Sequence, residues 1–174
     1  PHANTEVPIS DAKEALRLVR EHAEKWHINP KDVGIMGSSA GGHLASTVAT
    51  HSDSLTAPNF QILFYPVITF DYAFTHKGSR HGLIGENASQ EMVDLYSNEK
   101  QVTPQTPHAI MLLSDDDNVV PSPNSVNYYL ALKKNKVKAT MHIYPSGGHG
   151  WGIRENFKYH NEMMADLSAW LKSF

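Results

Sequence analysis

Residues 33–45 read VGIMGSSAGGHLA, and this stretch decides the fold. Its apolar beginning, residues 33–36, predicts a short buried β-strand, and its Ala- and Leu-containing end predicts the start of a helix. Between the two lies the pattern Gly-x-Ser-x-Gly, with Ser39 at its centre. A turn this tight between a strand and a helix holds the central residue in strained backbone geometry and lifts its side chain above the sheet.

The surroundings of Ser39 favour a nucleophile. Gly37 and Gly41 are expected to face crowding from the neighbouring strand and helix, which glycine avoids because it has no Cβ. The helix that begins behind Ser39 points its free N–H groups and its positive end at the place where an oxyanion would form. The motif alone also fits a plain strand-to-helix turn. A histidine and an acid further along the chain are needed to favour the nucleophile over the plain turn.

The composition fits one α/β domain over residues 1–174. The chain is 40% hydrophobic and 19% charged, which suits a globular domain with a sizeable core. A net charge of −3 offers no basic field for nucleic acid or an anionic membrane, and no apolar run is long enough to span a bilayer. The absence of cysteine excludes disulfides and thiolate sites. The histidines show no metal-ligand spacing, so we expect no metal and no cofactor.

Hydrophobic periodicity predicts alternating helices and strands along the chain. Helices are predicted over residues 10–26, 39–51, 91–96, 122–134 and 155–173, and strands over 33–36, 61–67, 109–113 and 139–144. The alternation predicts a parallel sheet of about four strands with helices on both faces. The rest of segment 68–107 shows no pattern and is expected to form a lid or a pocket wall.

Two aromatic or apolar patterns predict core packing. Trp26 is expected to lie in the core at the end of the first helix. The last helix is expected to bury one stripe of side chains, formed by Phe157, His160, Met164, Leu167 and Leu171.

Three chemistry-bearing residues follow three different predicted strands. Ser39, Asp117 and His149 each lie just beyond a strand's carboxyl end, and in a parallel sheet those ends meet at one edge. An imidazole can take the serine proton, and a carboxylate can hold the imidazole's tautomer and offset its charge. Asp115 and Asp116 compete for the acid role, but the spacing D-x-x-V-P places Asp117 in the turn before the next helix.

The order Ser, Asp, His on a parallel sheet resembles the α/β-hydrolase superfamily. Three motifs narrow the resemblance: GSSAGGHLAS at 37–46, DDNVVP at 116–121 and GGHGW at 147–151. Together they are similar to those of bacterial acetylxylan-esterase-like and feruloyl-esterase-like carbohydrate esterases. The resemblance covers essentially the whole chain, and it is specific because the three motifs occur together.

This resemblance implies roles for individual residues. Ser39 would be the nucleophile, Asp117 the triad acid, His149 the base, and the Ala40 N–H one oxyanion donor. The implied reaction is hydrolysis of short acyl esters, acetyl or feruloyl, on a carbohydrate such as xylan through an acyl-enzyme. The same relatives are often exported, although the sequence itself indicates no compartment.

The sequence departs from the family at its beginning. Family members carry about four strands before this point, including a His-Gly-Gly or Gly-Gly-Gly loop that gives a second oxyanion donor. No such loop occurs here, and the chain starts at Pro1. We therefore expect the C-terminal part of a longer hydrolase. The strand at 33–36 would be an exposed edge that pairs with a missing N-terminal segment or with a second copy.

Several alternatives remain at this stage. Trp151 and Tyr65 are expected to line a sugar or acyl pocket, with ordinary core packing as an equal alternative. A serine peptidase of the prolyl-oligopeptidase kind would share the order of the three residues. A non-catalytic fragment that keeps the three residues but lacks the oxyanion loop is a third reading.

Overall fold

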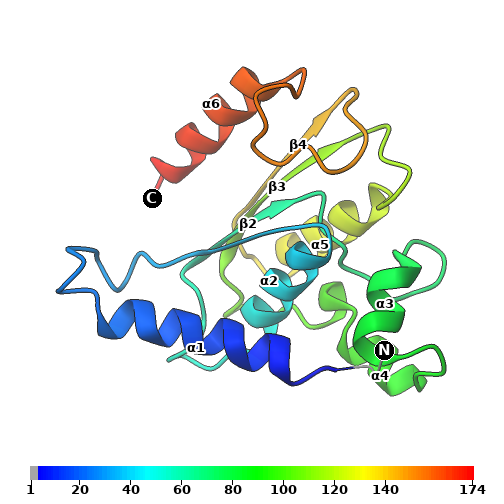
Figure 1. Ribbon diagram of the computed structural model, residues 1–174, viewed down its shortest axis with the longest axis horizontal. Helices are drawn as coiled ribbons and strands as arrows, with labels where there is room; N and C mark the ends of the chain where they lie inside the picture. The colour runs from blue at the N-terminus through cyan, green and yellow to red at the C-terminus, as the bar shows by residue number, and fades with distance from the viewer. Residues whose placement is uncertain (1–3) are drawn as a thin grey trace.

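Four parallel strands form the centre of the computed structural model, which describes residues 4–174 (Figure 1). Their order in the sheet is the order along the chain, β1-β2-β3-β4, and every neighbouring pair is parallel. The strands span Ile35–Ser38 (β1), Phe60–Phe64 (β2), His108–Ser114 (β3) and Ala139–Tyr144 (β4). All four carboxyl ends therefore meet at one edge of the sheet, as the predicted site requires.

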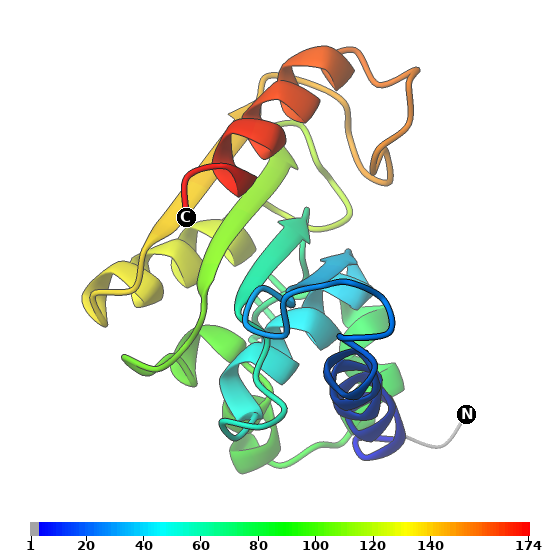
Figure 2. The same ribbon diagram turned by 90° about the vertical axis from the view of Figure 1, so that its left-hand side faces the viewer.

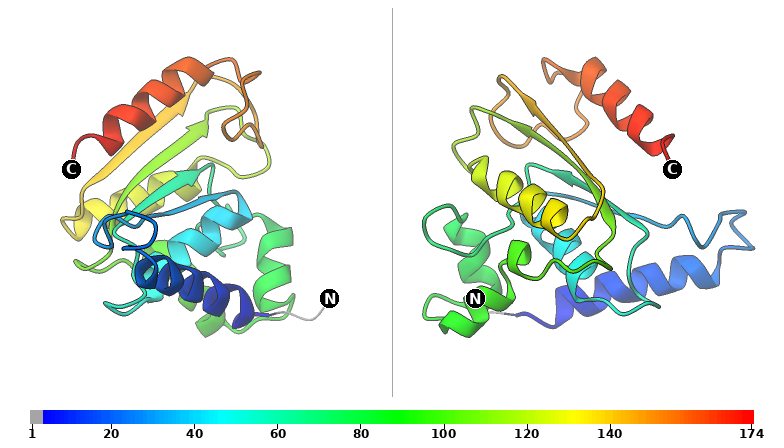
Figure 3. Two further views of the ribbon diagram at one scale, coloured as in Figure 1. Left: turned by 60° about the vertical axis from the view of Figure 1, so that its left-hand side comes forward. Right: turned by 180° about the vertical axis from the view of Figure 1, so that it is seen from behind.

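Helices cover both faces of this sheet (Figures 2 and 3). The helix α6 lies on one face, and α2 and α5 lie on the other, with α1 packed beside α2. The predicted α/β architecture is confirmed. The helices span Val7–Glu21 (α1), Ala40–His51 (α2), Lys77–Ile84 (α3), Gln90–Leu95 (α4), Pro123–Lys134 (α5) and His160–Leu171 (α6), with a short 3-10 turn, η1, at Asn98–Lys100.

The core follows from the alternation of side chains along the central strands. On β2, Ile62 contributes to the cluster that includes α6, whereas the next residue, Leu63, contributes to the cluster that includes α2 and α5. On β3, Ile110 and Met111 divide in the same way. Because both faces are covered, β2 and β3 read as almost continuous apolar runs, which is typical of parallel sheets.

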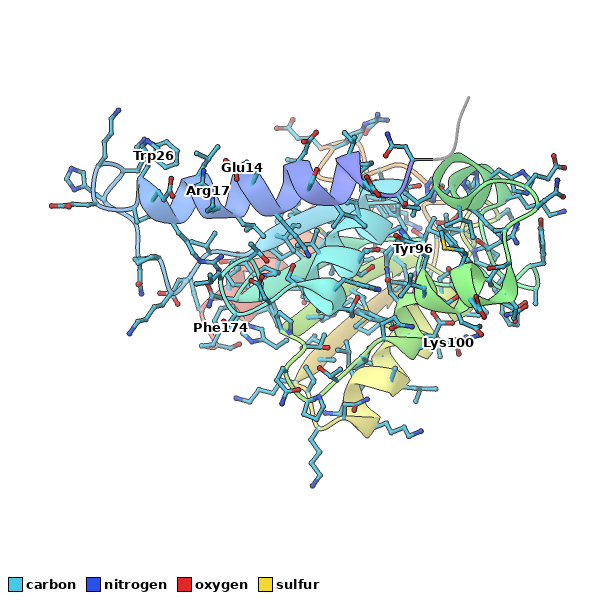
Figure 4. The ribbon with its side chains drawn as sticks, turned by 90° about the horizontal axis from the view of Figure 1, so that it is seen from below. Glu14, Arg17, Trp26, Tyr96, Lys100 and Phe174 are labelled. Carbon is cyan, nitrogen blue, oxygen red and sulfur yellow. The ribbon has the colours of Figure 1, made fainter. Side chains whose placement is uncertain are left out.

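The predicted bounds of the first helix are wrong at both ends. The helix starts at Val7 rather than residue 10, because the Asn4 side chain accepts hydrogen bonds from the N–H groups of Glu6 and Val7. It ends at Glu21 instead of residue 26. Trp26 therefore lies in the following turn and is 49% exposed, pointing away from the body of the molecule (Figure 4). The prediction that Trp26 packs in the core is wrong.

Two further boundaries differ from the predictions. The strand β2 ends at Phe64, because the next residue, Tyr65, has a φ of 33° that no strand accommodates. The helix α6 begins at His160 rather than near residue 155, which changes the buried stripe. Of the predicted stripe, Leu167 is buried, and so is Phe157, which precedes the helix. Met164 and Leu171 are exposed, and Met163 is buried instead.

The segment between β2 and β3 contains a helix that the sequence pattern does not reveal. This helix, α3, holds two glycines within eight residues, a composition that disfavours helix formation. Its start is stabilised by the His76 ring, which accepts a hydrogen bond from the N–H of Ser79. Helix α4 was expected over residues 91–96 and occupies Gln90–Leu95.

No helix in the part of the chain that the structure describes is long and apolar enough to cross a bilayer. Within residues 4–174, no group of three or more His, Asp or Glu side chains has the arrangement of a metal site.

Candidate active site

Ser39 lies in a sharp turn between β1 and α2, with a φ of 55° and a ψ of −122°. A non-glycine residue adopts this conformation only when its surroundings enforce it. Three backbone hydrogen bonds do so here. The Ser39 N–H donates to the Phe64 carbonyl at 3.0 Å, and the Ser39 carbonyl accepts from the N–H groups of His43 and Val67, both at 3.1 Å.

Two glycines allow the turn to be this tight, and only one of them was predicted. A Cβ on Gly37 would lie 2.1 Å from the backbone oxygen of Gly41, so no side chain fits there. A Cβ on Gly42 would lie 2.7 Å from the Cβ of Pro66. At Gly41 a Cβ would meet nothing within 4 Å, so the predicted crowding at Gly41 is wrong for the described residues. On the helix side, the close approach is at the next residue, Gly42, which lies against Pro66.

This difference predicts opposite effects of two alanine substitutions. Gly37→Ala is expected to lower the free energy of unfolding by about 3 kcal/mol or more, because the backbone of α2 must move away from β1. Gly41→Ala is expected to raise it by about 0.5–1 kcal/mol, because alanine favours a helix more than glycine does. Urea unfolding of both variants tests this, and equal effects at the two positions would contradict the geometry.

The three residues singled out in the sequence lie in one hydrogen-bonded row. The His149 Nε2 is 2.8 Å from the Ser39 Oγ, and the His149 Nδ1 is 2.7 Å from the Asp117 Oδ2. The three residues come from the ends of β1, β3 and β4. The loops after three separate strands therefore bring a hydroxyl, an imidazole and a carboxylate together.

The hydrogen bonds of Asp117 fix which nitrogen of His149 carries the proton. The side chain is buried, and its Oδ1 accepts from the N–H groups of Val119 and Val120, both at 2.9 Å. Its Oδ2 is left to accept from the Nδ1–H of His149. With the proton held on Nδ1, the Nε2 lone pair of His149 faces the Ser39 hydroxyl and can accept its proton.

Asp116 holds the loop that carries the histidine, a role that sequence reasoning missed. Its Oδ1 accepts from the N–H of Gly148 at 2.8 Å, and this hydrogen bond lowers the pKa of the Asp116 carboxyl below its usual range. Gly147 has a φ of 146°, and a Cβ there would lie 2.4 Å from the Phe157 ring. Gly147 therefore serves close packing of this loop, whereas Gly148 and Gly150, which flank His149, have open space around a Cβ and are favoured by their positive φ of 58° and 88°.

Trp151 and Tyr65 hold the same loop in place through ring stacking and hydrogen bonds. The Trp151 ring stacks on Phe157 with centroids 4.0 Å apart, and its Nε1 donates to the Ser114 Oγ at 2.8 Å. The Tyr65 hydroxyl accepts from the N–H of Gly152 at 2.7 Å. Both side chains are buried. Their burial fits core packing, and the alternative that they line a substrate pocket stays a prediction.

Ala40 begins α2 and is exposed beside Ser39. The first N–H groups of a helix have no partner within it, so the Ala40 N–H is available to a negatively charged oxygen near Ser39. A largely apolar hollow of about 460 Å³ lies next to Ala40, between α2 and α3. Its walls include Ile9, Leu44, Phe70 and Leu83.

His43, in the first turns of α2, is a buried structural residue. Its Nε2–H donates to the Tyr96 carbonyl at 2.8 Å, and its ring stacks on Phe70 with centroids 4.3 Å apart. Burial lowers the pKa of His43 from its ordinary value of 6.5 to about 4, against a weaker opposite effect of that hydrogen bond. The nucleophile's helix is thus tied to the segment before η1 by a neutral imidazole.

The lowered pKa of His43 predicts acid sensitivity. Between about pH 6.5 and pH 4 the unfolded chain binds a proton that the folded chain excludes, so the free energy of unfolding falls as the pH falls. The full difference from this residue is about 3 kcal/mol. His43→Gln keeps a donor for the Tyr96 carbonyl and removes the titration, so its stability is expected to vary less over this range. His51 and His108 are present in both proteins, so the difference between the two urea-unfolding profiles isolates His43. Parallel profiles would contradict the prediction.

The order of the strands, the helices on both faces and the position of Ser39 define an α/β-hydrolase fold. The chain belongs to the prolyl oligopeptidase family, whose sequence profile matches residues 3–174. The acetylxylan esterase of Xylanibacter ruminicola is 42% identical over 177 residues, which cover 99% of this chain and 37% of that protein.

Solved structures show the same similarity. An acetyl ester-xyloside bifunctional hydrolase from Caldicellulosiruptor lactoaceticus matches with a TM-score of 0.91 and 37% identity, over 98% of this chain and 66% of that one. A sugar hydrolase from Lactococcus lactis matches with a TM-score of 0.78 and 27% identity, over 94% of this chain and 67% of that one. The chain thus spans 37% of the curated esterase and 66% of the first solved relative.

Proposed function

We propose that this chain carries the catalytic residues of a serine esterase that hydrolyses short acyl esters on a carbohydrate such as xylan. The observation that carries the proposal is the row of contacts from Asp117 through His149 to Ser39. The similarity to an acetylxylan esterase and to an acetyl ester-xyloside hydrolase supports the substrate class.

In the proposed reaction, Ser39 attacks the ester carbonyl while His149 takes the hydroxyl proton. Asp117 keeps the imidazole in the required tautomer and stabilises the imidazolium. The tetrahedral intermediate collapses when the C–O bond to the sugar breaks, and His149 gives its proton to the departing alcohol. Water, activated by the same imidazole, then attacks the acyl-enzyme and releases the carboxylic acid.

The Ala40 N–H is one donor to the oxyanion of the tetrahedral intermediate. An acyl-transfer site ordinarily uses two such donors, and loss of one lowers turnover by about 10²–10³. We therefore expect the chain of residues 1–174 to form an acyl-enzyme slowly, and a longer protein that supplies the second donor to form it faster.

The test combines labelling with substrate specificity. A fluorophosphonate is expected to label Ser39 stoichiometrically, identified by peptide mass spectrometry. Acid release is then measured from acetylated xylan, feruloylated arabinoxylan and p-nitrophenyl acetate, with the proposed longer protein as well as residues 1–174. Acid release from acetylated or feruloylated xylan supports the proposal. Labelling without any ester hydrolysis by either protein would overturn it.

A second candidate is a serine peptidase, and the match to the prolyl oligopeptidase family favours it. The same three residues would cleave a peptide bond. Chromogenic dipeptide amides and p-nitrophenyl acetate, measured side by side, separate the two readings. The third reading, an inert fragment, predicts no fluorophosphonate labelling in folded protein.

We also propose that further polypeptide covers the edge of the sheet at β1. Within the described residues β1 pairs with β2 alone, and its Met36 is 60% exposed. A hollow of about 480 Å³ beside it has apolar walls that include Leu16, Val19 and Leu44. An exposed edge of this kind favours pairing with another strand. The 66% coverage of the solved relative favours a strand from outside residues 1–174 over a second copy.

The oligomeric state tests this part of the proposal. Sedimentation of residues 1–174 at several concentrations is expected to show a monomer, and the proposed longer protein is expected to protect the β1 amides from hydrogen exchange. Concentration-dependent dimers that protect the same amides would show that a second copy is the partner.

A further inference from the structure

Arg80, on α3, is a buried cation that the proposed reaction does not use. The residue is 3% exposed. Its Nη1 donates to the Tyr72 hydroxyl at 2.6 Å, and a longer contact of 3.4 Å joins it to the Glu86 carbonyl. The guanidinium lies over the Tyr72 ring, 4.0 Å from the ring centroid. All of these partners are neutral groups.

No carboxylate among the described residues forms an ion pair with Arg80. Arg80 takes part in none of the ion pairs found among residues 4–174. Its Nε is buried and has no hydrogen-bond partner in this part of the chain. The nearby Lys100, in contrast, pairs with Asp94, and the Asp71 carboxylate caps the N–H of Ala73. A buried charge without a counter-ion is costly, so a partner for this guanidinium would stabilise the protein.

Arg80 forms part of the wall of a polar hollow of about 360 Å³. Tyr72, Gln90 and Lys100 line the same hollow. The Tyr72 hydroxyl contacts the His81 ring, and the side chains of Gln90 and Lys100 donate to Asp94. Phe70 contributes to this hollow and also to the apolar hollow beside Ala40. The polar hollow is therefore a neighbour of the apolar hollow beside Ala40.

We propose that this hollow binds the carboxylate of a small monoanion through Arg80. A guanidinium presents donors in a planar fork that matches a carboxylate, and Gln90 can add a hydrogen bond. Asp71 and Glu86 also line the hollow. Their charges repel every anion but repel a dianion such as phosphate about twice as strongly, so we expect a monoanion to bind better than phosphate. The carboxylate can belong to a free acid such as acetate or to a uronic acid on a polysaccharide.

The experiment measures binding without catalysis, in Ser39→Ala protein, so the result does not depend on the proposed esterase activity. Acetate, glucuronate, glucose and inorganic phosphate are titrated separately and followed by NMR shifts of the α3 amides. Acetate, glucuronate or both are expected to bind saturably, and glucose and phosphate are not. Binding of acetate alone identifies a free acid as the ligand, and binding of glucuronate alone identifies a sugar-borne carboxylate.

Two variants decide whether Arg80 is responsible. Arg80→Gln removes the charge and is expected to weaken carboxylate binding by about tenfold or more. Lys77→Gln removes a charge from the exposed start of the same helix, outside the lining of the hollow; it is the matched control and is expected to change affinity by less than about threefold. Arg80→Lys keeps the positive charge but lacks the planar pair of donors, and it replaces Arg80→Gln in the test if Arg80→Gln does not fold. Failure of both carboxylates to bind, or equal binding by the parent protein and the folded Arg80 variant, would overturn the proposal.

Discussion

Replacement of Ser39 by alanine is expected to lower kcat for p-nitrophenyl acetate by about 10⁶, the loss expected when a serine nucleophile is removed. The substitution takes away the Ser39 Oγ, which the His149 Nε2 contacts at 2.8 Å, and no acyl-enzyme can form. The alanine retains the backbone of the turn, so the fold is expected to survive. Initial rates, together with fluorophosphonate titration to exclude traces of the parent protein, measure the effect.

The neighbouring serine provides a matched control. Ser38 is the last residue of β1 and is exposed, and its side chain is not part of the row that contains His149. Ser38→Ala is expected to keep kcat within about threefold of the parent value, because it leaves the contacts among Ser39, His149 and Asp117 in place. If Ser38→Ala abolished labelling and Ser39→Ala retained it, the assignment of the nucleophile would move by one residue.

The sheet was predictable because two independent signals agreed on it. Apolar runs marked the four strands, and the regular alternation with helices required parallel strands with both faces covered. The boundaries were less predictable because single side chains decide them. Asn4 caps α1 before the expected start, and the positive φ of Tyr65 ends β2 early. Neither effect appears in a hydrophobic pattern.

The site was predictable to the extent that topology alone places it. Ser39, Asp117 and His149 each come after a strand, and parallel strands bring the loops at their carboxyl ends to one edge of the sheet. The supporting contacts were not predictable, because they join residues far apart in the chain. Asp116, in the loop after β3, contacts Gly148 in the loop after β4. Arg80 lies on α3, whose two glycines give that helix a low helix propensity. A signal for Asp116 was present in the run of three acids, but the sequence does not say which acid contacts which loop.

Replacement of Asp117 by asparagine is expected to lower kcat by about 10⁴ and to leave the fold intact. The asparagine oxygen can still accept from the N–H groups of Val119 and Val120, so its amide nitrogen must face the His149 Nδ1. That nitrogen donates, and His149 then carries its proton on Nε2, facing Ser39. An imidazole in this tautomer cannot take the serine proton. Initial rates measure the loss, and circular dichroism confirms the fold.

Substitutions of the adjacent acid, Asp116, distinguish the orientation of the His149 imidazole from the position of the loop that carries it. Asp116→Asn keeps an oxygen that can accept from the Gly148 N–H, so kcat is expected to stay within about threefold of the parent value. Asp116→Ala removes this acceptor and is expected to lower kcat by about tenfold, because a displaced imidazole reacts less often. Fluorophosphonate labelling should slow most in Asp117→Asn, less in Asp116→Ala and least in Asp116→Asn. A greater loss in Asp116→Asn than in Asp117→Asn would assign the acid role to Asp116 instead.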